Sequence, residues 1–379
     1  MFPLIEVSGS ARERGQQYGL KAKSRIERSI TTYARLFAYC GISWQGAQRA
    51  GAGYRDLIGD LDPALLAEID GIAAGAGRHA DEILALNART EILPPNYPGN
   101  AHPDQARIAA ANAQLGVADW GECTSIAVKP AQSATATTLL AQNWDWLGAQ
   151  RAALVLLRVR DAGGASFITL TEAGMLAKIG LNSRGFGVCL NILRSTDDGE
   201  HAGVPVHILL RALLARHSVA DAVTFASKLT FGASSNVLCA DASGDTAALE
   251  FSPRGLEVIR GTNTALCHTN HFLAPLAAKH QASLAPSLST VPRLARVTAL
   301  TGAHSGKYAV ADLERMLRDE SAGFLSICRR PDPSIAPEIR LETVAAVVMD
   351  LGERMMHIAP DIPSTVEFVP VALGETVPA

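Results

Sequence analysis

The sequence predicts an α+β fold, and three observations carry that prediction. Residues 11–93 place apolar side chains at helical spacing, whereas the chain from residue 123 onward is dominated by short strand-like runs. Two helical stretches, 204–229 and about 290–319, interrupt those runs. The strands therefore fall into groups before and after a helical pair, which favours α+β over a parallel sheet of alternating strands and helices.

The N-terminal part is expected to contain at least three helices. Asp62 and Pro63 form a helix-start signal, because the carboxylate can cap the first turn and proline suits its first position. Gly75 and Gly77 are expected to end that helix, and Asp81 is expected to cap the next one. An earlier helix is predicted by apolar residues that share one face: Ile26, Ile30, Tyr33, Phe37 and Cys40.

The strand-like runs are short, and many are joined by turn residues such as Gly, Ser, Asp and Pro. The helical stretch 204–229 contains a predicted capping box from Ser218 to Asp221. The expected strands are 123–129, 137–146, 153–160, 166–173, 185–193, 236–241, 246–252, 256–261, 265–270, 343–350 and 354–359.

Length and composition fit a soluble globular protein. The 379 residues, 48% of them hydrophobic and 19% charged, can bury a large core in one domain or two. The net charge is −3 and no basic stripe occurs, which argues against nucleic acid or membrane as a partner. Glu6 comes too early for a secretory leader, and no apolar run approaches a membrane span, so a cytoplasmic location is expected. The six cysteines lack Cys-x-x-Cys spacing, so neither disulfides nor a thiolate zinc site is predicted.

One cysteine stands at the start of a predicted strand. Cys123 follows Glu122 and precedes Thr124, Ser125 and an apolar run. A thiol has a pKa of about 8.5, so a nucleophilic cysteine needs a proton acceptor, and a free α-amine with a pKa of about 7.7–8.0 can serve. Cys123 would gain that amine only if its thiol attacked the Glu122 carbonyl and the peptide bond broke. The irregular segment 94–117 could present this bond; the alternative is an inert buried cysteine.

Polar residues in the next predicted strand are further candidates. Asn143 and Asp145 alternate with Trp144 and Trp146, so one face carries an amide and a carboxylate while the other carries indoles. If this strand pairs with the strand of Cys123 as a hairpin, Asp145 can orient the new amine. The alternative interpretation is a strand with one solvated face.

Two other residues can support acyl chemistry. Asn236, at the head of a predicted strand, can offer its side-chain N–H to a developing oxyanion, and the alternative is a turn asparagine. Arg293 can hold a carboxylate with its fork of donors, although arginines on a helix surface are commoner.

The segment from Cys267 to His271 offers two competing interpretations. His268 or His271, with Asn270, can complete a papain-like Cys-His-Asn triad with Cys123. The two histidines can also ligate a metal, but without a third convincing ligand no metal site is expected. The glycines at 174, 180, 185 and 187 lack the G-x-G-x-x-G spacing, so a dinucleotide site is not supported.

Six motifs stand in one order along the chain. They are Gly15-Gln16-Gln17-Tyr18-Gly19, Glu68-Ile69-Asp70-Gly71-Ile72-Ala73, Leu86-Asn87-Ala88-Arg89-Thr90-Glu91, Glu122-Cys123-Thr124-Ser125, Gln142-Asn143-Trp144-Asp145 and Gly180-Leu181-Asn182-Ser183-Arg184-Gly185-Phe186-Gly187. In this order they resemble the C45 family of autoproteolytic acyltransferases and hydrolases, the family of acyl-coenzyme A:6-aminopenicillanic acid acyltransferase. The resemblance extends over most of the chain and is far more specific than any single motif.

The resemblance implies an N-terminal-nucleophile hydrolase fold, which is a four-layer αββα sandwich, here with a helical N-terminal segment. It also implies a precursor that cleaves itself before Cys123. The products would be a helical segment, 1–122, and a catalytic part, 123–379, which remain associated as a heterodimer within one globular unit. Glu122 departs from the family pattern, because the penicillin enzyme has glycine at this place.

The same resemblance assigns roles to single residues. Cys123 matches the nucleophile, Asp145 the carboxylate of the following strand, Asn236 the oxyanion-hole asparagine, and Arg293 an arginine near the site. Further candidates for the substrate pocket or for support of these residues are Thr124, Asn143, Trp144 and Asn191.

The function predicted from these observations is acyl transfer through a thioester on Cys123. The preferred reaction is hydrolysis of a small amide, with a small acyl amide or thioester as substrate and without a cofactor. The first alternative is an N-acyltransferase that uses a coenzyme A thioester as its acyl donor. The others are a papain-like hydrolase without self-cleavage and a non-enzymatic binding protein.

Overall fold

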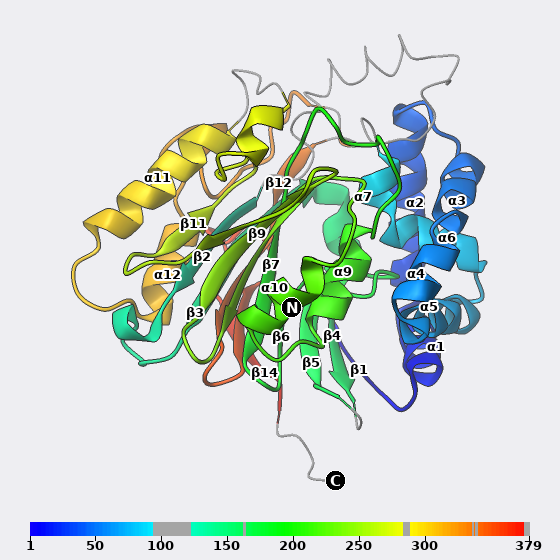
Figure 1. Ribbon diagram of the computed structural model, residues 1–379, viewed down its shortest axis with the longest axis horizontal. Coiled ribbons are helices and arrows are strands. Elements are labelled where there is room, and N and C mark those ends of the chain that lie inside the picture. Colours follow the sequence, from blue (N-terminus) through cyan, green and yellow to red (C-terminus); the bar gives the residue numbers. More distant parts are fainter. Residues whose placement is uncertain (94–122, 162–163, 283–288, 336, 338–339, 375–379) are drawn as a thin grey trace.

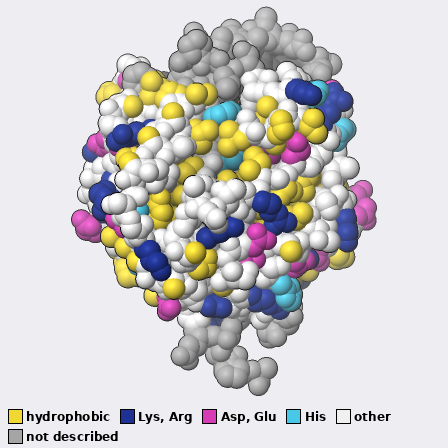
Figure 2. Space-filling model, turned by 60° about the vertical axis from the view of Figure 1, so that its left-hand side comes forward, with side chains coloured by type: hydrophobic (Ala, Val, Ile, Leu, Met, Phe, Trp, Pro, Cys, Tyr) yellow, Lys and Arg dark blue, Asp and Glu magenta, His cyan; other side chains and the backbone are white. Residues whose placement is uncertain are grey.

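The computed structural model describes residues 1–374 apart from 94–122, 162–163, 283–288, 336 and 338–339. The predicted irregular segment 94–117 and Glu122 lie outside the described residues. Among the described helices, none is both long and apolar enough to cross a bilayer. On the face shown in Figure 2, basic and acidic side chains are interspersed among apolar ones and form no continuous basic patch.

Two β-sheets form the centre of the molecule. Every neighbouring pair of strands is antiparallel except β1 with β4, which is parallel. In the described residues the larger sheet has the order β1 (Leu4–Ser8), β4 (Leu154–Arg160), β5 (Phe167–Glu172), β6 (Ile179–Asn182), β7 (Phe186–Ile192), β8 (Ser235–Asp241), β9 (Thr246–Ser252) and β10 (Gly255–Arg260). The smaller sheet has the order β11 (Leu266–His268), β2 (Cys123–Val128), β3 (Leu139–Leu147), β12 (Leu341–Asp350), β13 (Met355–Ala359) and β14 (Val369–Ala372).

Helices cover both sides of this pair of sheets (Figure 1). Two of them, α11 (Thr290–Ala303) and α12 (Val310–Leu317), pack their apolar residues on the outer face of the smaller sheet. On the other side, α9 (Val206–Leu213) and α10 (Val219–Ala226) lie with the N-terminal helices. The order helix, sheet, sheet, helix confirms the predicted αββα sandwich with a helical N-terminal segment.

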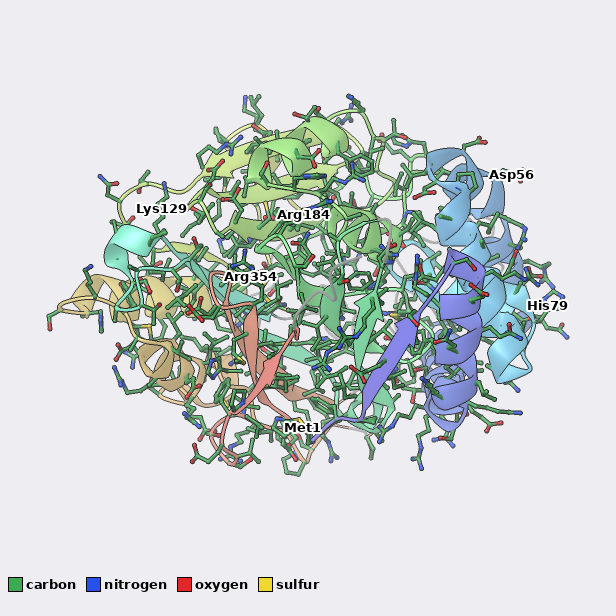
Figure 3. The ribbon with its side chains drawn as sticks, turned by 90° about the horizontal axis from the view of Figure 1, so that it is seen from below. Met1, Asp56, His79, Lys129, Arg184 and Arg354 are labelled. Atoms are coloured by element: carbon green, nitrogen blue, oxygen red, sulfur yellow. The ribbon has the colours of Figure 1, made fainter. Side chains whose placement is uncertain are left out.

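The N-terminal helices form one block beside the larger sheet. In Figure 3, Asp56 and His79 mark the outer side of this block, whereas Lys129, just after β2, lies on the opposite side of the molecule. The helices of the block are α1 (Ala11–Lys21), α2 (Lys23–Tyr39), α3 (Trp44–Ala52), α4 (Arg55–Leu61), α5 (Pro63–Ala76), α6 (Ala80–Asn87) and α7 (Arg89–Ile92).

The predicted hairpin of β2 with β3 is present, and its register decides which side chains face each other. Trp144 lies opposite Cys123, and Asn143 lies opposite Thr124. Cys123 and Trp144 belong to the core between the sheets, whereas the Asn143 amide donates to the Leu317 carbonyl of α12 at 2.8 Å. All of β3 is buried, so the alternative of a solvated strand face is wrong.

The sequence prediction missed three short strands, β1, β6 and β14. Each has only four or five residues, and β1 and β14 are edge strands, so the period-two signal is brief. The predicted helical stretches 204–229 and 290–319 are each split into two helices by a turn. The predicted Asp81 cap is also wrong: His79 is the N-cap of α6, and its Nδ1 accepts from the Asp81 N–H at 3.3 Å.

Four glycines, Gly15 and Gly19 of α1 with Gly71 and Gly75 of α5, allow the two helices to cross with their backbones in contact. A Cβ atom on Gly15 would lie 2.1 Å from the Glu68 carbonyl oxygen, and one on Gly71 would lie 2.3 Å from the Arg12 carbonyl oxygen. Because both obstacles are backbone atoms, neither can move aside without separating the helices. Gly15 and Gly71, singled out in the sequence motifs, thus have a packing role.

We expect Gly71→Ala to lower the free energy of unfolding by about 1–3 kcal/mol, because the added methyl group overpacks this crossing. The matched control is Gly302→Ala in α11, where a Cβ meets no atom within 4 Å. That change should be neutral or stabilise by up to about 1 kcal/mol, since alanine favours the helix. Urea unfolding of both variants measures the difference, and equal stabilities would contradict the crossing geometry.

Candidate active site

Cys123 is the first residue of β2, and its backbone is held on both sides. Its N–H donates to Asn270 Oδ1 at 2.7 Å. Its carbonyl accepts from Arg293 Nη1 at 2.6 Å and from Asn191 Nδ2 at 3.1 Å. The side chain is 2% exposed. The atoms that acyl chemistry would use are therefore fixed by three side chains from three different elements.

Arg293 is the hub of these contacts. It is fully buried in α11, where Nη1 also donates to Thr124 Oγ1 at 3.0 Å, Nη2 to Asn270 Oδ1 at 2.8 Å and Nε to Ser289 Oγ at 2.8 Å. The alternative of a helix-surface arginine is therefore wrong. The guanidinium is not an exposed binding group for a substrate carboxylate. It fixes the start of β2 through its hydrogen bonds to Cys123 and Thr124.

Asn270 has a different role from the triad amide that the sequence suggests. In the structure it follows β11, and its Nδ2 donates to the Ile192 carbonyl at 2.9 Å while its N–H donates to Thr290 Oγ1 at 2.7 Å. Its Oδ1 is the shared acceptor for Cys123 and Arg293. The residue therefore orients the Cys123 nitrogen without help from a histidine.

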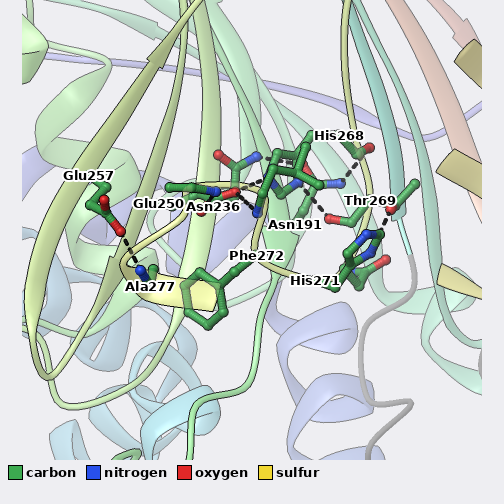
Figure 4. A network of polar contacts seen from close by, with 12 residues as sticks. Asn191, Asn236, Glu250, Glu257, His268, Thr269, His271, Phe272 and Ala277 are labelled. Carbon is green, nitrogen blue, oxygen red and sulfur yellow. Dashed lines mark hydrogen bonds and ion pairs between the residues drawn. The ribbon is translucent and has the colours of Figure 1, made fainter. Parts of the chain in front are cut away.

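Both ring nitrogens of His268 and Nδ1 of His271 have partners other than Cys123 (Figure 4). The His268 ring uses both nitrogens elsewhere, with Nε2 2.7 Å from Glu250 Oε1 and Nδ1 2.8 Å from the Thr269 carbonyl. His271 Nδ1 lies 2.8 Å from Thr290 Oγ1, and burial lowers its pKa to about 4. Within the described part of the chain, no cluster of potential ligands could hold a metal ion.

Asn236 reaches Cys123 through Asn191. The two asparagines lie opposite each other in β8 and β7, and Asn236 Nδ2 donates to Asn191 Oδ1 at 3.0 Å. Ser125 Oγ donates to the same oxygen at 2.7 Å, which leaves Asn191 Nδ2 directed at Cys123. Asn236 is fully buried inside a strand, so it is not a turn asparagine.

Asp145 is buried on the outer side of the smaller sheet. By strand alternation its carboxyl group projects away from the core face that carries Trp144 and the Cys123 thiol. Oδ1 accepts from Thr343 Oγ1 at 2.5 Å, and Oδ2 has no hydrogen-bond partner within the described structure. Burial raises the Asp145 pKa to about 7, although the charge of Arg293 opposes the shift.

Lys178 is a neighbour of the thiol that the sequence interpretation missed. Its Nζ lies 3.7 Å from the centre of the Trp144 ring and 3.4 Å from Glu172 Oε2. Burial lowers the Lys178 pKa to about 7. Burial also raises the pKa of the Cys123 thiol, and the positive charge of Lys178 opposes that rise. A single lysine in a turn has no sequence motif that would reveal this position.

The N-terminal helices contribute to the same buried network. Tyr33 of α2 donates through a short hydrogen bond to Glu172 Oε1 and accepts from Trp146 Nε1 at 2.9 Å. Arg89 of α7 lies 3.2 Å from Glu172 Oε2. Residues from the first 93 positions therefore complete the surroundings of Lys178.

A pH dependence of stability follows from Asp145. Its carboxyl group titrates near 7 in the folded chain but near 3.8 in the unfolded chain, so its contribution to stability is present below about pH 4 and is lost as the pH rises through 7. When the pH is raised from 4.5 to 8, we expect the free energy of unfolding of Asp145→Asn to rise relative to that of its parent by about a few kcal/mol. Both proteins carry Cys123→Ala, which keeps the nitrogen of residue 123 a neutral amide.

Urea unfolding at the two pH values measures this change. A stability difference that does not vary with pH would mean that folding leaves the pKa of Asp145 where it is in the unfolded chain.

Tyr33→Phe tests the network that joins the N-terminal helices to the sheet. The variant leaves Glu172 Oε1 without its hydroxyl donor, so we expect a loss of about 1.5–3 kcal/mol in the free energy of unfolding. Tyr39→Phe, at an exposed position of the same helix, is the matched control and should stay within about 0.5 kcal/mol. A Tyr33→Phe variant as stable as the control would show that the short contact carries no net stabilisation.

Two sequence comparisons each match more than half of the chain. The sequence model of the acyl-coenzyme A:6-aminopenicillanic acid acyl-transferase family matches residues 132–363. The 40 kDa form of acyl-coenzyme A:6-aminopenicillanic-acid-acyltransferase from Emericella nidulans is 30% identical over 335 residues, which cover 86% of this chain and 84% of that protein.

Two solved structures are similar at low identity. A mutant of conjugated bile acid hydrolase from Clostridium perfringens is 11% identical with a TM-score of 0.47, and the match covers 66% of this chain and 92% of that one. Penicillin V acylase from Agrobacterium tumefaciens is 14% identical with a TM-score of 0.42, and the match covers 62% of this chain and 82% of that one. The family match and the Emericella relative place the chain in the acyl-coenzyme A:6-aminopenicillanic acid acyltransferase family.

Proposed function

We propose that the protein is a self-processing cysteine amidohydrolase that cleaves small amides through a thioester on Cys123. The observation that carries the proposal is the position of the Cys123 nitrogen, whose N–H donates to Asn270 Oδ1 at 2.7 Å. This nitrogen and the thiol belong to the same residue. If the Glu122–Cys123 bond is cut, this nitrogen becomes an amine that is already oriented. Nucleophile and base then belong to one residue, and no histidine is needed.

The proposed self-cleavage needs only the chain itself. The Cys123 thiol attacks the carbonyl carbon of Glu122, and the C–N bond breaks as the nitrogen takes up a proton. Glu122 is then joined to the sulfur as a thioester, which water hydrolyses to a carboxylate and a free thiol. The contacts of Asn270, Asn191 and Arg293 support this step, because they keep Cys123 in place while its peptide bond is broken.

The proposed catalytic cycle repeats this chemistry on a substrate. The α-amine accepts the thiol proton, and the sulfur attacks the amide carbonyl. The side-chain N–H of Asn236 and a backbone N–H hold the oxyanion, and the α-ammonium group gives its proton to the leaving amine. Water, deprotonated by the same amine, then releases the acyl group as a carboxylic acid.

Asp145 has the role of stabilising the α-ammonium form in this proposal. Its Oδ2 has no partner in the described structure, and its charge lies close enough to the thiol to raise the pKa of Cys123. Asn143, Thr124 and Trp144 support the site from the hairpin, and Asn191 supports it from β7. The fragments 1–122 and 123–379 would stay together, because Tyr33 and Arg89 bond to Glu172.

A second candidate function is favoured by the relative from Emericella nidulans, which is named as an acyltransferase. In that case the acyl donor is a coenzyme A thioester, and an amine instead of water accepts the acyl group from Cys123. The two reactions share the acyl-enzyme and differ in the acceptor. Product analysis with an acyl-coenzyme A and an amine separates them, because only a transferase forms the new amide faster than the free acid.

The intact mass of freshly purified protein, under denaturing conditions, tests the self-processing step. We expect the parent to give two masses, for residues 1–122 and 123–379, and Cys123→Ala to give one. The variant Cys239→Ala, which changes another buried thiol, is the control and should give two masses. A parent that is a single chain and hydrolyses amides would overturn the α-amine mechanism.

A further inference from the structure

Within the described residues, the guanidinium of an arginine just beyond β7 forms neither an ion pair nor a hydrogen bond. Arg194 follows the strand by two residues, and its side chain is 6% exposed. Nε and Nη1 are buried without a hydrogen-bond partner, and the guanidinium forms no ion pair in the described part of the chain. Asp198 is close enough to influence its pKa, but that carboxylate bonds to Ser234 Oγ and the Ser195 N–H. A buried, unpaired guanidinium is costly, so its presence calls for a ligand.

A second unsatisfied polar atom belongs to Glu91. Its Oε1 accepts from the Val206 N–H at 2.8 Å, while Oε2 is buried without a partner in the described structure. The charge of Glu91 acts on the pKa of Arg194, which places the two groups near each other. An orphaned carboxyl oxygen of α7 and an orphaned guanidinium after β7 thus act on each other without forming an ion pair in the described structure.

This cluster adjoins the candidate active site. The Ile192 carbonyl accepts from Asn270 Nδ2, and Asn270 Oδ1 accepts from the Cys123 nitrogen. Two residues of chain, at most about 7 Å, separate Ile192 from Arg194.

We propose that Arg194 anchors a carboxylate-binding subsite, and that the amide substrate of Cys123 carries a carboxylate. The inference rests on the proposed function and adds a substrate class to it. A guanidinium presents a planar fork of N–H donors that matches the two oxygens of a carboxylate. Glu91 assists as a neutral donor below about pH 7, because burial raises its pKa to about 7.

Matched substrates test this subsite. N-benzoylglycine and N-benzoylglycinamide differ only in the charge on the leaving amine, and the N-benzyl monoamide of succinic acid and its carboxamide differ only on the acyl side. For at least one pair we expect the parent to prefer the carboxylate by about tenfold to a hundredfold in kcat/KM. Arg194→Met should remove that preference, Arg194→Lys should restore part of it, and the exposed control Arg49→Met should keep it.

Melting temperature separates a binding role from a structural one. Without ligand, Arg194→Met should melt at the same temperature as the parent or higher, because it removes an uncompensated buried charge. A lower melting temperature would mean that Arg194 serves the fold, and would overturn the proposal. A preference for neutral substrates, or a carboxylate preference that survives Arg194→Met, would overturn it as well.

The same probes distinguish failure of the subsite from failure of the proposed function. Each probe should raise the melting temperature of the parent when bound, and the carboxylate of the preferred pair should raise it more. If this difference is present and absent in Arg194→Met, the subsite stands even where no amide is hydrolysed, and only the amidohydrolase function fails. If amides are hydrolysed but neither carboxylate binds better than its amide, only the subsite fails.

Discussion

The structure around Cys123 depends on one side-chain oxygen, Oδ1 of Asn270, which accepts two hydrogen bonds. It accepts from the Cys123 nitrogen and from Arg293, whose guanidinium also donates to the Cys123 carbonyl. Through these bonds the start of β2, the segment after β11 and the helix α11 fix one another. Because Cys123 and Arg293 are buried, loss of the Asn270 side chain would leave their N–H donors unsatisfied and release the nucleophile from its position. The proposed chemistry depends on this arrangement, since a base on the nucleophile's own residue is useful only if its nitrogen is held.

The second constraint is electrostatic and lies between the sheets. Glu172 has two cations within ion-pair distance, Arg89 and Lys178. Arg194, by contrast, has no carboxylate within ion-pair distance in the described structure. Buried charges of this kind are poor stabilisers, so their concentration beside a candidate nucleophile is better explained by chemistry than by folding. The N-terminal helices supply Arg89 and Tyr33, which makes the first part of the chain a component of the site and not only a cover for the sheet.

Much of the fold, and part of the site, could be predicted from the sequence. Alternation of Asn143 and Asp145 with two tryptophans predicted a strand with two unlike faces, and the change of period near residue 123 predicted the α+β class. Lys178 and Arg194 could not be predicted, because a lone charged residue in a turn has no periodic signal and its neighbours come from distant helices. The buried position of Arg293 in α11 could not be predicted either, because the sequence around it does not distinguish it from an arginine on a helix surface. The triad of Cys123 with His268 failed because Glu250, a partner distant in sequence, occupies the imidazole.

The measurement that tests the central claim most directly is a crystal structure of the purified protein, because it shows whether the peptide bond between Glu122 and Cys123 is broken. The proposal predicts a free amino terminus at Cys123, with its nitrogen still within hydrogen-bond distance of Asn270 Oδ1 and the thiol beside it. A chain that continues unbroken from Glu122 into Cys123 in active protein would contradict the account. So would a free amine that has turned away from Asn270, because the nitrogen would then not have been oriented before cleavage.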